Sequence, residues 1–245
     1  FKRYDLTAMA VTNAQNKILG IITVDDVVDI IVEEANEDIA LLSGVSTMED
    51  PYLKTPILKL VWKCVPWIIC LMILQVFSTM ILSSFDSALA SFIVLSVFTP
   101  LIMDAGGNSG GQTTTIIVRS IALDEFSRGD FKKVIWKELR VALCIAAIIA
   151  TFAFAWLMFE MNVGIVDLKD TLIKYPSLNQ IQVSLTVASL VASTLFVTIT
   201  ISRIVGCMLP FLAKLLKRDP AVMCGPLTTT IVDIVSLLTY FLLWT

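Results

Sequence analysis

The sequence predicts an all-α integral membrane protein with five transmembrane helices per subunit, preceded by a smaller polar segment. Of its 245 residues, 57% are hydrophobic and 16% are charged, whereas soluble domains average about 45–50% apolar and about 25% charged residues. The mean hydropathy is +0.85, and the apolar residues gather in five long runs. The sequence pI of about 5.0 offers no basic surface to nucleic acid, so we expect the lipid bilayer as partner and no nucleic acid.

Each of the five runs is long enough to cross a hydrocarbon core of about 30 Å, which takes about 20 apolar residues in a helix. They cover residues 65–82, 88–118, 141–159, 183–209 and 223–244, and the second contains a glycine-rich centre. Residues 1–53 carry three basic and ten acidic side chains, and the remainder carries fifteen and eleven. The chain therefore divides near residues 51–56 into an acidic polar part and a mildly basic apolar part.

Lysine and arginine in the connections between the runs predict the orientation in the membrane. They gather between the second and third runs and between the fourth and fifth, as Arg119, Arg128, Lys132, Lys133, Lys137, Arg140, Lys214, Lys217 and Arg218. The opposite side carries only Lys169 and Lys174. Because basic connections stay in the cytoplasm, we expect a cytoplasmic N-terminus and an outside C-terminus in the cell (plasma or inner) membrane.

The polar part predicts a short buried strand over residues 19–24 and a helix over residues 25–42, whose apolar side chains recur at helical spacing. No Lys or Arg occurs from Ile18 to Leu53, although nine acidic residues lie there. One helical face carries Asp26, Asp29, Glu33 and Glu37. This face is either simply solvated, as most charge runs are, or it binds Mg²⁺ or Ca²⁺, which prefer carboxylate oxygens. The missing bases favour a cation-sensing element.

The second run contains a polar stripe, because Asp104, Asn108 and Gln112 recur every four residues inside a membrane helix. The pairs Gly106/Gly110 and Gly107/Gly111 have the spacing that lets two helices approach closely. Proline and glycine weaken such a helix and free carbonyl groups, which is tolerated only against protein or water. The stripe is therefore either a helix-packing motif with polar contacts or a pore wall of amide and carbonyl oxygens, and its length favours the pore.

The last run contains a single carboxylate, Asp233, about a third of the way along an otherwise apolar span. A charge at this depth costs at least several kcal/mol unless it is paired or solvated. Thr229 and Ser236 extend a narrow polar face around it. Asp233 could be protonated or paired with Arg119 or Arg203 of another helix, but a water-filled cation path explains it best.

The sequence does not favour an enzyme. It has no histidine, and its five cysteines lack the spacing of a soft-metal site. The acids inside the membrane have no nucleophile or acid–base partner nearby, and the chain has no GKS/GKT phosphate loop.

Several stretches of the chain resemble the bacterial MgtE family of magnesium channels. PLIMDAGGNSGGQ with TIIVRSIAL, then KELRVAL, and finally DPAVMCGPLTTTIVDIVSLLTYF are similar to the family's motifs in order and spacing. LGIITVDDVVDIIVEEANEDI resembles the end of the family's second CBS domain and its connecting helix. The resemblance implies the C-terminal part of a CBS domain at 1–31, a cytosolic connecting helix at 32–61 and a five-helix pore domain at 62–245. It also implies a homodimer whose pore is lined chiefly by the second and fifth helices.

The resemblance also implies roles for individual residues. Asp233 matches the family's pore aspartate, and Asn108 matches the asparagine of the glycine-rich motif. We expect the pore set to be Asp233, Asn108, Gly106, Gly107, Gln112, Asp104, Thr229 and the backbone near Pro226. The acids on positions that bind regulatory cytosolic Mg²⁺ in the family are Asp26, Asp29, Glu34, Glu37 and Asp38. Gly225 departs from the pattern, because some members have asparagine there.

The function expected from these observations is passive, Mg²⁺-selective uptake, gated by cytosolic Mg²⁺, so that Mg²⁺ is both the transported ion and a regulatory ligand. One alternative is a carrier or exchanger for a wider set of divalent cations, including Co²⁺ and Mn²⁺. Another is a membrane sensor of metal or nucleotide that transports nothing.

Overall fold

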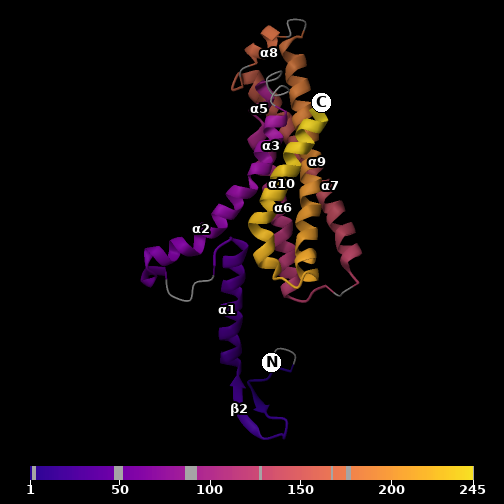
Figure 1. The fold of residues 1–245 in the computed structure, drawn as a ribbon. Helices are drawn as coiled ribbons and strands as arrows, with labels where there is room; N and C mark the ends of the chain where they lie inside the picture. The colour runs from indigo at the N-terminus through magenta and orange to yellow at the C-terminus, as the bar shows by residue number, and fades with distance from the viewer. Residues whose placement is uncertain are drawn as a thin grey trace. The chain divides into compact units, whose positions relative to one another are not determined.

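A computed structural model describes residues 1, 4–46, 52–85, 93–126, 129–166, 168–174 and 178–244. The chain divides into two compact units, Phe1–Cys64 and Val65–Thr245. Figure 1 traces the elements of both.

The first unit contains a β-hairpin followed by a helix. Strands β1 (Ala8–Thr12) and β2 (Ile18–Thr23) pair antiparallel. The Asn13 side chain closes the turn between them, because its Oδ1 accepts the backbone N–H groups of Gln15 and Lys17 at 3.0 and 2.9 Å. The expected strand at 19–24 is thus confirmed in position to within one residue. Its expected burial is wrong: Leu19 and Ile21 are 69% and 68% exposed, because the hairpin packs on no further sheet within the described residues of this unit.

Helix α1 (Val24–Leu42) follows β2 directly and agrees with the helix expected over 25–42. It does not continue through the whole of the expected connecting segment at 32–61. After the C-cap residue Ser43, Gly44 adopts a positive φ of 70°, which ends a helix in the left-handed conformation that glycine permits. The next described elements are a short 3₁₀ helix, η1 (Tyr52–Lys54), and helix α2, which begins at Ile57.

The remaining elements are all helical. They are α2 (Ile57–Leu74), α3 (Val76–Ser84), α5 (Ile93–Ser96), α6 (Thr99–Ala122), α7 (Phe131–Val163), α8 (Lys169–Lys174), α9 (Gln180–Leu215) and α10 (Pro220–Trp244). Among the described residues, four segments are long and apolar enough to cross a membrane: Ile57–Ser84, Phe131–Val163, Gln180–Leu215 and Gly225–Leu243. The second of the five expected spans, at 88–118, is not among these four; it overlaps α6, whose glycines and polar side chains make it less apolar. At 24 residues, α6 is about 36 Å long, which is enough to span. Part of the expected span at 88–118 lies outside the described residues.

Helix α9 is the centre of the second unit, since it contacts α7, α6 and α10, and α6 also contacts α10 (Figure 1). The largest fully buried side chains of the main cluster include Leu157, Met161, Leu195, Tyr240 and Phe241. Small buried residues on α9, such as Ala188 and Ala192, bring the helices together as in other membrane bundles.

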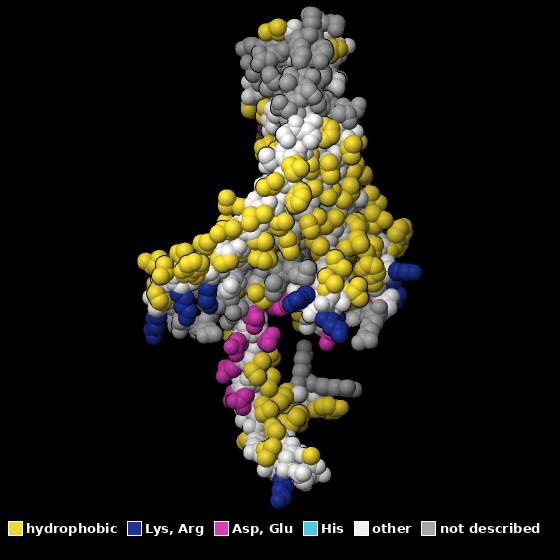
Figure 2. Space-filling view, viewed as in Figure 1, with side chains coloured by type: hydrophobic (Ala, Val, Ile, Leu, Met, Phe, Trp, Pro, Cys, Tyr) yellow, Lys and Arg dark blue, Asp and Glu magenta, His cyan; other side chains and the backbone are white. Residues whose placement is uncertain are grey.

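The lateral surface of the helical unit is apolar. Ile148, Phe152 and Trp156 on α7 are 68%, 64% and 50% exposed. Figure 2 shows hydrophobic side chains over these sides and basic side chains at the end where the α6–α7 and α9–α10 connections lie. This distribution agrees with a helical unit that is surrounded by lipid, with its basic connections at one membrane surface.

Candidate functional site

Helix α6 has two faces of opposite character. The face toward α9 and α10 is buried and carries Gly106, Gly110, Thr113 and Ile117. The other face carries Asp104, Asn108 and Gln112, all exposed in the single chain. The polar stripe expected from the sequence is therefore continuous, and it lies on the side of α6 that this chain leaves uncovered. Within the described residues, no hydrogen bond or ion pair satisfies any of these three side chains.

The buried face of α6 packs closely against α9 and α10 because glycines, which have no side chain, lie where the helices cross. A Cβ atom added at Gly106 would lie 2.7 Å from Ser236 Oγ and 2.9 Å from Thr198 Cγ2. A Cβ atom at Gly110 would lie 3.1 Å from Val232 Cγ2 and 3.2 Å from the Ser202 carbonyl oxygen. Gly106 thus belongs to the packed face. Gly107 is also buried, but a Cβ atom added there would lie farther from its neighbour, 3.6 Å from Thr229 Cγ2.

Asp233 lies on α10, half-buried, and no hydrogen-bond or ion-pair partner is found for it among the described residues. The contacts of Gly106 with Ser236 and of Gly110 with Thr228 make α6 and α10 antiparallel. This register brings Asp233 within about one helical turn of Asn108 along the pair. The lone carboxylate and the polar stripe therefore lie at a similar depth on two neighbouring helices.

Thr229, Thr230 and Ser236 of α10 are satisfied by their own helix. Thr229 is exposed and donates to the Pro226 carbonyl at 2.8 Å, Thr230 donates to the same oxygen at 3.2 Å, and the buried Ser236 donates to the Val232 carbonyl at 2.6 Å. The Pro226 carbonyl, expected as a free oxygen ligand, is thus already an acceptor of two hydroxyl groups.

The pairing of Asp233 with Arg203, one explanation left open by the sequence, is wrong. Arg203 on α9 pairs with Glu138 on α7, with Nη2 and Nε lying 2.6 and 2.7 Å from Glu138 Oε1. Thr113 on α6 donates to the same oxygen at 3.0 Å. Arg119 is exposed, and no ion pair links it to Asp233 among the described residues. Glu138 is not among the residues predicted from the sequence. The signal that could have found it is an acid and a base, Glu138 and Arg203, in two neighbouring membrane helices.

The acidic residues of α1 include one with a clear structural role. Asp26 Oδ2 accepts the backbone N–H and the hydroxyl of Thr23 at 2.7 and 2.6 Å, and this completes a capping box at the start of α1. The hydrogen bonds from the Thr23 side chain and backbone lower the pKa of the Asp26 carboxyl. Asp29, Glu34, Glu37 and Asp38 follow on the exposed helix. Across the described part of one chain, no three acidic or cysteine side chains come together as a metal site.

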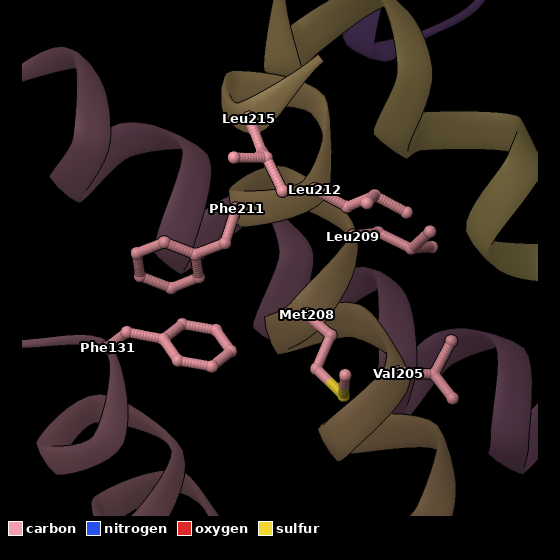
Figure 3. Close-up of a pocket in the computed structure, with 7 residues that line it drawn as sticks. All are labelled: Phe131, Val205, Met208, Leu209, Phe211, Leu212 and Leu215. Carbon is pink, nitrogen blue, oxygen red and sulfur yellow. The ribbon is translucent and has the colours of Figure 1, made fainter.

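A cavity of about 500 Å³ lies away from these groups, at the C-terminal part of α9 (Figure 3). Two of its lining residues, Phe131 and Phe211, have rings in an edge-to-face arrangement with their centroids 5.1 Å apart. Its lining is apolar and consists of Phe131, Val205, Met208, Leu209, Phe211, Leu212 and Leu215. None of the expected pore residues borders it, so it offers no ligand to a cation.

Apolar helices packed around α9, with the uncovered polar face of α6 beside the lone carboxylate of α10, define a membrane transport protein. A model of the MgtE family, described as a divalent cation transporter, matches residues 99–243. The chain belongs to the MgtE family, and this family is one of transporters, not enzymes.

Similar curated proteins share the family name. The chain is 30% identical over 244 residues to the magnesium transporter MgtE of Bacillus subtilis, covering 98% of this chain and 48% of that protein. It is 30% identical over 237 residues to the magnesium transporter MgtE of Thermus thermophilus (97% and 48%) and 31% identical over 238 residues to that of Enterococcus faecalis (97% and 47%). The chain thus spans about half the length of the curated relatives it matches.

Proposed function

We propose that this chain forms the ion path of a Mg²⁺-selective channel that works as a homodimer and takes up Mg²⁺ passively. The observation that carries the proposal is the half-buried Asp233, which has no partner among the described residues. A carboxylate inside a membrane helix is stable only beside a counter-charge or water. A hydrated cation supplies both.

The second copy follows from the uncovered stripe of α6. Asp104, Asn108 and Gln112 are exposed in the single chain, and lipid would leave their polar groups unsatisfied. Two copies that meet along α6 and α10 would enclose these side chains in a water-filled path. Two Asp233 carboxylates facing each other would repel in this setting, and a divalent cation between them removes the repulsion.

The chemistry of the lining suits Mg²⁺ with its water shell. Mg²⁺ gives up water reluctantly and keeps several water ligands in most sites. In the proposed path, Asp233 supplies charge, while the oxygens of Asn108, Gln112, Asp104 and Thr229 accept hydrogen bonds from the bound waters. The membrane potential supplies about 2.3 kcal/mol per charge per 100 mV, and twice that for a divalent ion, so that inward flow needs no other energy source.

We assign residues 1–31 to the end of a CBS domain, 32–61 to the connecting segment and 62–245 to a five-span pore domain, with the N-terminus in the cytoplasm and the C-terminus outside. The acids of α1 then lie in the cytoplasm, where Asp26, Asp29, Glu34, Glu37 and Asp38 bind Mg²⁺ and hold the channel closed. Because three acids do not converge within the described part of one chain, such a site needs ligands from a second copy or another domain.

The gating proposal predicts that replacing Glu34 and Glu37 with glutamine weakens closure by internal Mg²⁺, since fewer carboxylates then bind the ion. The concentration of internal Mg²⁺ that halves the flux should rise in vesicles, whereas Asp25→Asn, outside the assigned set, should leave it unchanged. An unchanged dose response in the Glu34→Gln/Glu37→Gln protein would show that these acids are merely solvated.

A wider divalent transporter is the second candidate, because the family description refers to divalent cations and not to Mg²⁺ alone. Competition of Mn²⁺ and Co²⁺ with Mg²⁺ in a flux assay separates the two candidates. Flux that requires an opposing ion gradient would indicate an exchanger.

The test of the pore assignment is Mg²⁺ flux into proteoliposomes that contain Asp233→Ala. We expect loss of flux while the protein still inserts and assembles, because the charge that binds the cation is gone. Glu160→Gln is the matched control, since Glu160 is also an acid of a membrane helix but accepts a hydrogen bond from the exposed Trp156 at 2.8 Å. Undiminished flux in Asp233→Ala would refute the assignment, and a protein without flux of any divalent cation would favour a sensor.

A further inference from the structure

The buried ion pair between α7 and α9 is not used by the proposed cation path, yet it reaches the helix that carries the polar stripe. Arg203 is 3% exposed and Glu138 is 9% exposed. Glu138 Oε1 accepts from Arg203 at 2.6 and 2.7 Å and from Thr113, which is fully buried, at 3.0 Å. One carboxylate oxygen therefore links α6, α7 and α9.

Stability alone gives a weak reason for this arrangement. Burying two charges costs several kcal/mol for each ion, and well-packed apolar side chains often stabilise a fold as much as a buried pair does. A buried pair does fix geometry, because removing either partner leaves an uncompensated charge. The hydroxyl of Thr113 has only a long alternative acceptor, the Ser109 carbonyl at 3.4 Å.

The link of the Arg203–Glu138 pair to Thr113 bears on how α6 is oriented. Successive residues of a helix point about 100° apart, so turning Thr113 toward Glu138 turns its neighbour Gln112 to the uncovered face. Gly106 and Gly110 permit a close approach to α9 and α10, but they present no side chain that would lock the rotation of α6 about its axis. Two side chains of α6 supply directional contacts there. The Thr114 hydroxyl meets α9 and α10 at longer distances, 3.1 Å from the Gly206 carbonyl and 3.2 Å from Thr228 Oγ1, and the Thr113 hydroxyl donates to the ionic group Glu138 at 3.0 Å.

We propose that Glu138, held by Arg203, is a positioning residue that fixes the rotation of α6 through Thr113 and so aligns the polar stripe with the cation path. This inference rests on the proposed function, in which Asn108 and Gln112 contact the hydrated ion. Glu138 itself touches no ion.

The first test compares Thr113→Val with Thr113→Ser in Mg²⁺ flux at varied Mg²⁺ concentration. Valine keeps the shape and removes the hydroxyl, so we expect the KM for Mg²⁺ to change about three- to tenfold, which corresponds to the loss of one buried hydrogen bond. Serine keeps the hydroxyl and should retain the parent KM. Thr200→Val is the matched control, since Thr200 on α9 donates only to the Phe196 carbonyl of its own helix. Equal KM values for the valine and serine variants would overturn the proposal.

A variant of Glu138 and a measurement of thiol reactivity test the same proposal independently of Thr113→Val and of Mg²⁺ flux, respectively. Glu138→Asp retains the charge opposite Arg203 but shortens the reach to Thr113, so it should shift KM in the same way if Thr113→Val fails to fold. Independently of transport, Gln112→Cys in a protein lacking the native cysteines reports the rotation of α6 by its reaction rate with a charged thiol reagent. Thr113→Val should change that rate several-fold, and an unchanged rate would contradict the positioning role. A Gln112→Cys protein that never reacts would instead refute the water-filled path, and the inference with it.

Discussion

At the scale of single residues, two aspartates differ in their surroundings, and this difference separates their roles. Asp233 is half-buried in an apolar helix, and the base that could have neutralised it, Arg203, is already paired with Glu138. Asp26 on α1 is fully exposed in solvent, yet its carboxylate is held by Thr23 in the capping box. Asp233 is thus available to a ligand, whereas one oxygen of Asp26, Oδ2, already has a structural task at the start of α1.

The capping role of Asp26 predicts a pH dependence at the start of α1. The hydrogen bonds of Thr23 lower the pKa of Asp26 from its ordinary value of 3.8, so the ionised form stabilises the folded helix above that value. This contribution is lost as the pH falls through the lowered pKa. Amide hydrogen exchange in residues 24–28, corrected for intrinsic rates, should therefore lose protection below about pH 4.

Asp26→Asn should weaken the same protection already at neutral pH, because the charged acceptor is missing. Asp29→Asn is the control, since Asp29 takes no part in the capping box. Identical protection in both variants would contradict a capping role and leave Asp26 free to bind metal with its neighbours.

At the scale of elements, the packing of α6 against α9 and α10 depends on glycines at the crossing points. A Cβ atom at Gly206 would run into the Gly110 carbonyl oxygen and would lie 2.9 Å from Thr114 Oγ1. The Thr114 hydroxyl at this point lies 3.1 Å from the Gly206 carbonyl and 3.2 Å from Thr228 Oγ1, so α6, α9 and α10 meet there.

We expect Gly206→Ala to destabilise the protein by about 1–3 kcal/mol, because the obstacle is backbone that cannot move aside. Gly111→Ala should be neutral or slightly stabilising, since nothing lies within 4 Å of its added Cβ and alanine favours helix. Thermal unfolding of the purified proteins in detergent measures both. Equal unfolding temperatures for the two variants would contradict the close helix contact.

The elements show which features could be predicted from the sequence. Hydrophobic runs locate α7, α9 and α10, because span length and composition are local properties. The stripe of Asp104, Asn108 and Gln112 follows from helical spacing alone. The partners of Arg203 and the packed position of Gly106 depend on how helices far apart in sequence face one another, and no local pattern encodes that. The helical spacing of the apolar residues also locates α1 and its end at Leu42, whereas the longer connecting helix at 32–61 is implied only by the resemblance.

At the scale of the whole molecule, the number of spans decides the topology. Four segments among the described residues are apolar enough to span, and α6 is long enough but more polar because it carries the stripe. Five spans place the two termini on opposite sides of the membrane, and four place them on the same side.

We expect alkaline phosphatase fused after the C-terminus to be active outside the cytoplasm, and a fluorescent protein fused there to stay dark. A fluorescent protein fused within the α9–α10 connection should fluoresce, because Lys214, Lys217 and Arg218 keep this connection inside. A fluorescent C-terminal fusion would contradict α6 as a fifth span, and with it the pore assignment of Asn108.

The proposed assembly of two copies follows from single residues and from helices, because the stripe of Asp104, Asn108 and Gln112 is exposed in one chain and Asp233 has no partner among the described residues. The central claim is that Asp233 faces its counterpart across a hydrated divalent cation. Electron cryomicroscopy of the protein in lipid nanodiscs with Mg²⁺ tests this most directly. The account predicts a dimer with both Asp233 side chains directed at ion density on the two-fold axis, whereas an Asp233 that points into lipid or pairs with an arginine would contradict it.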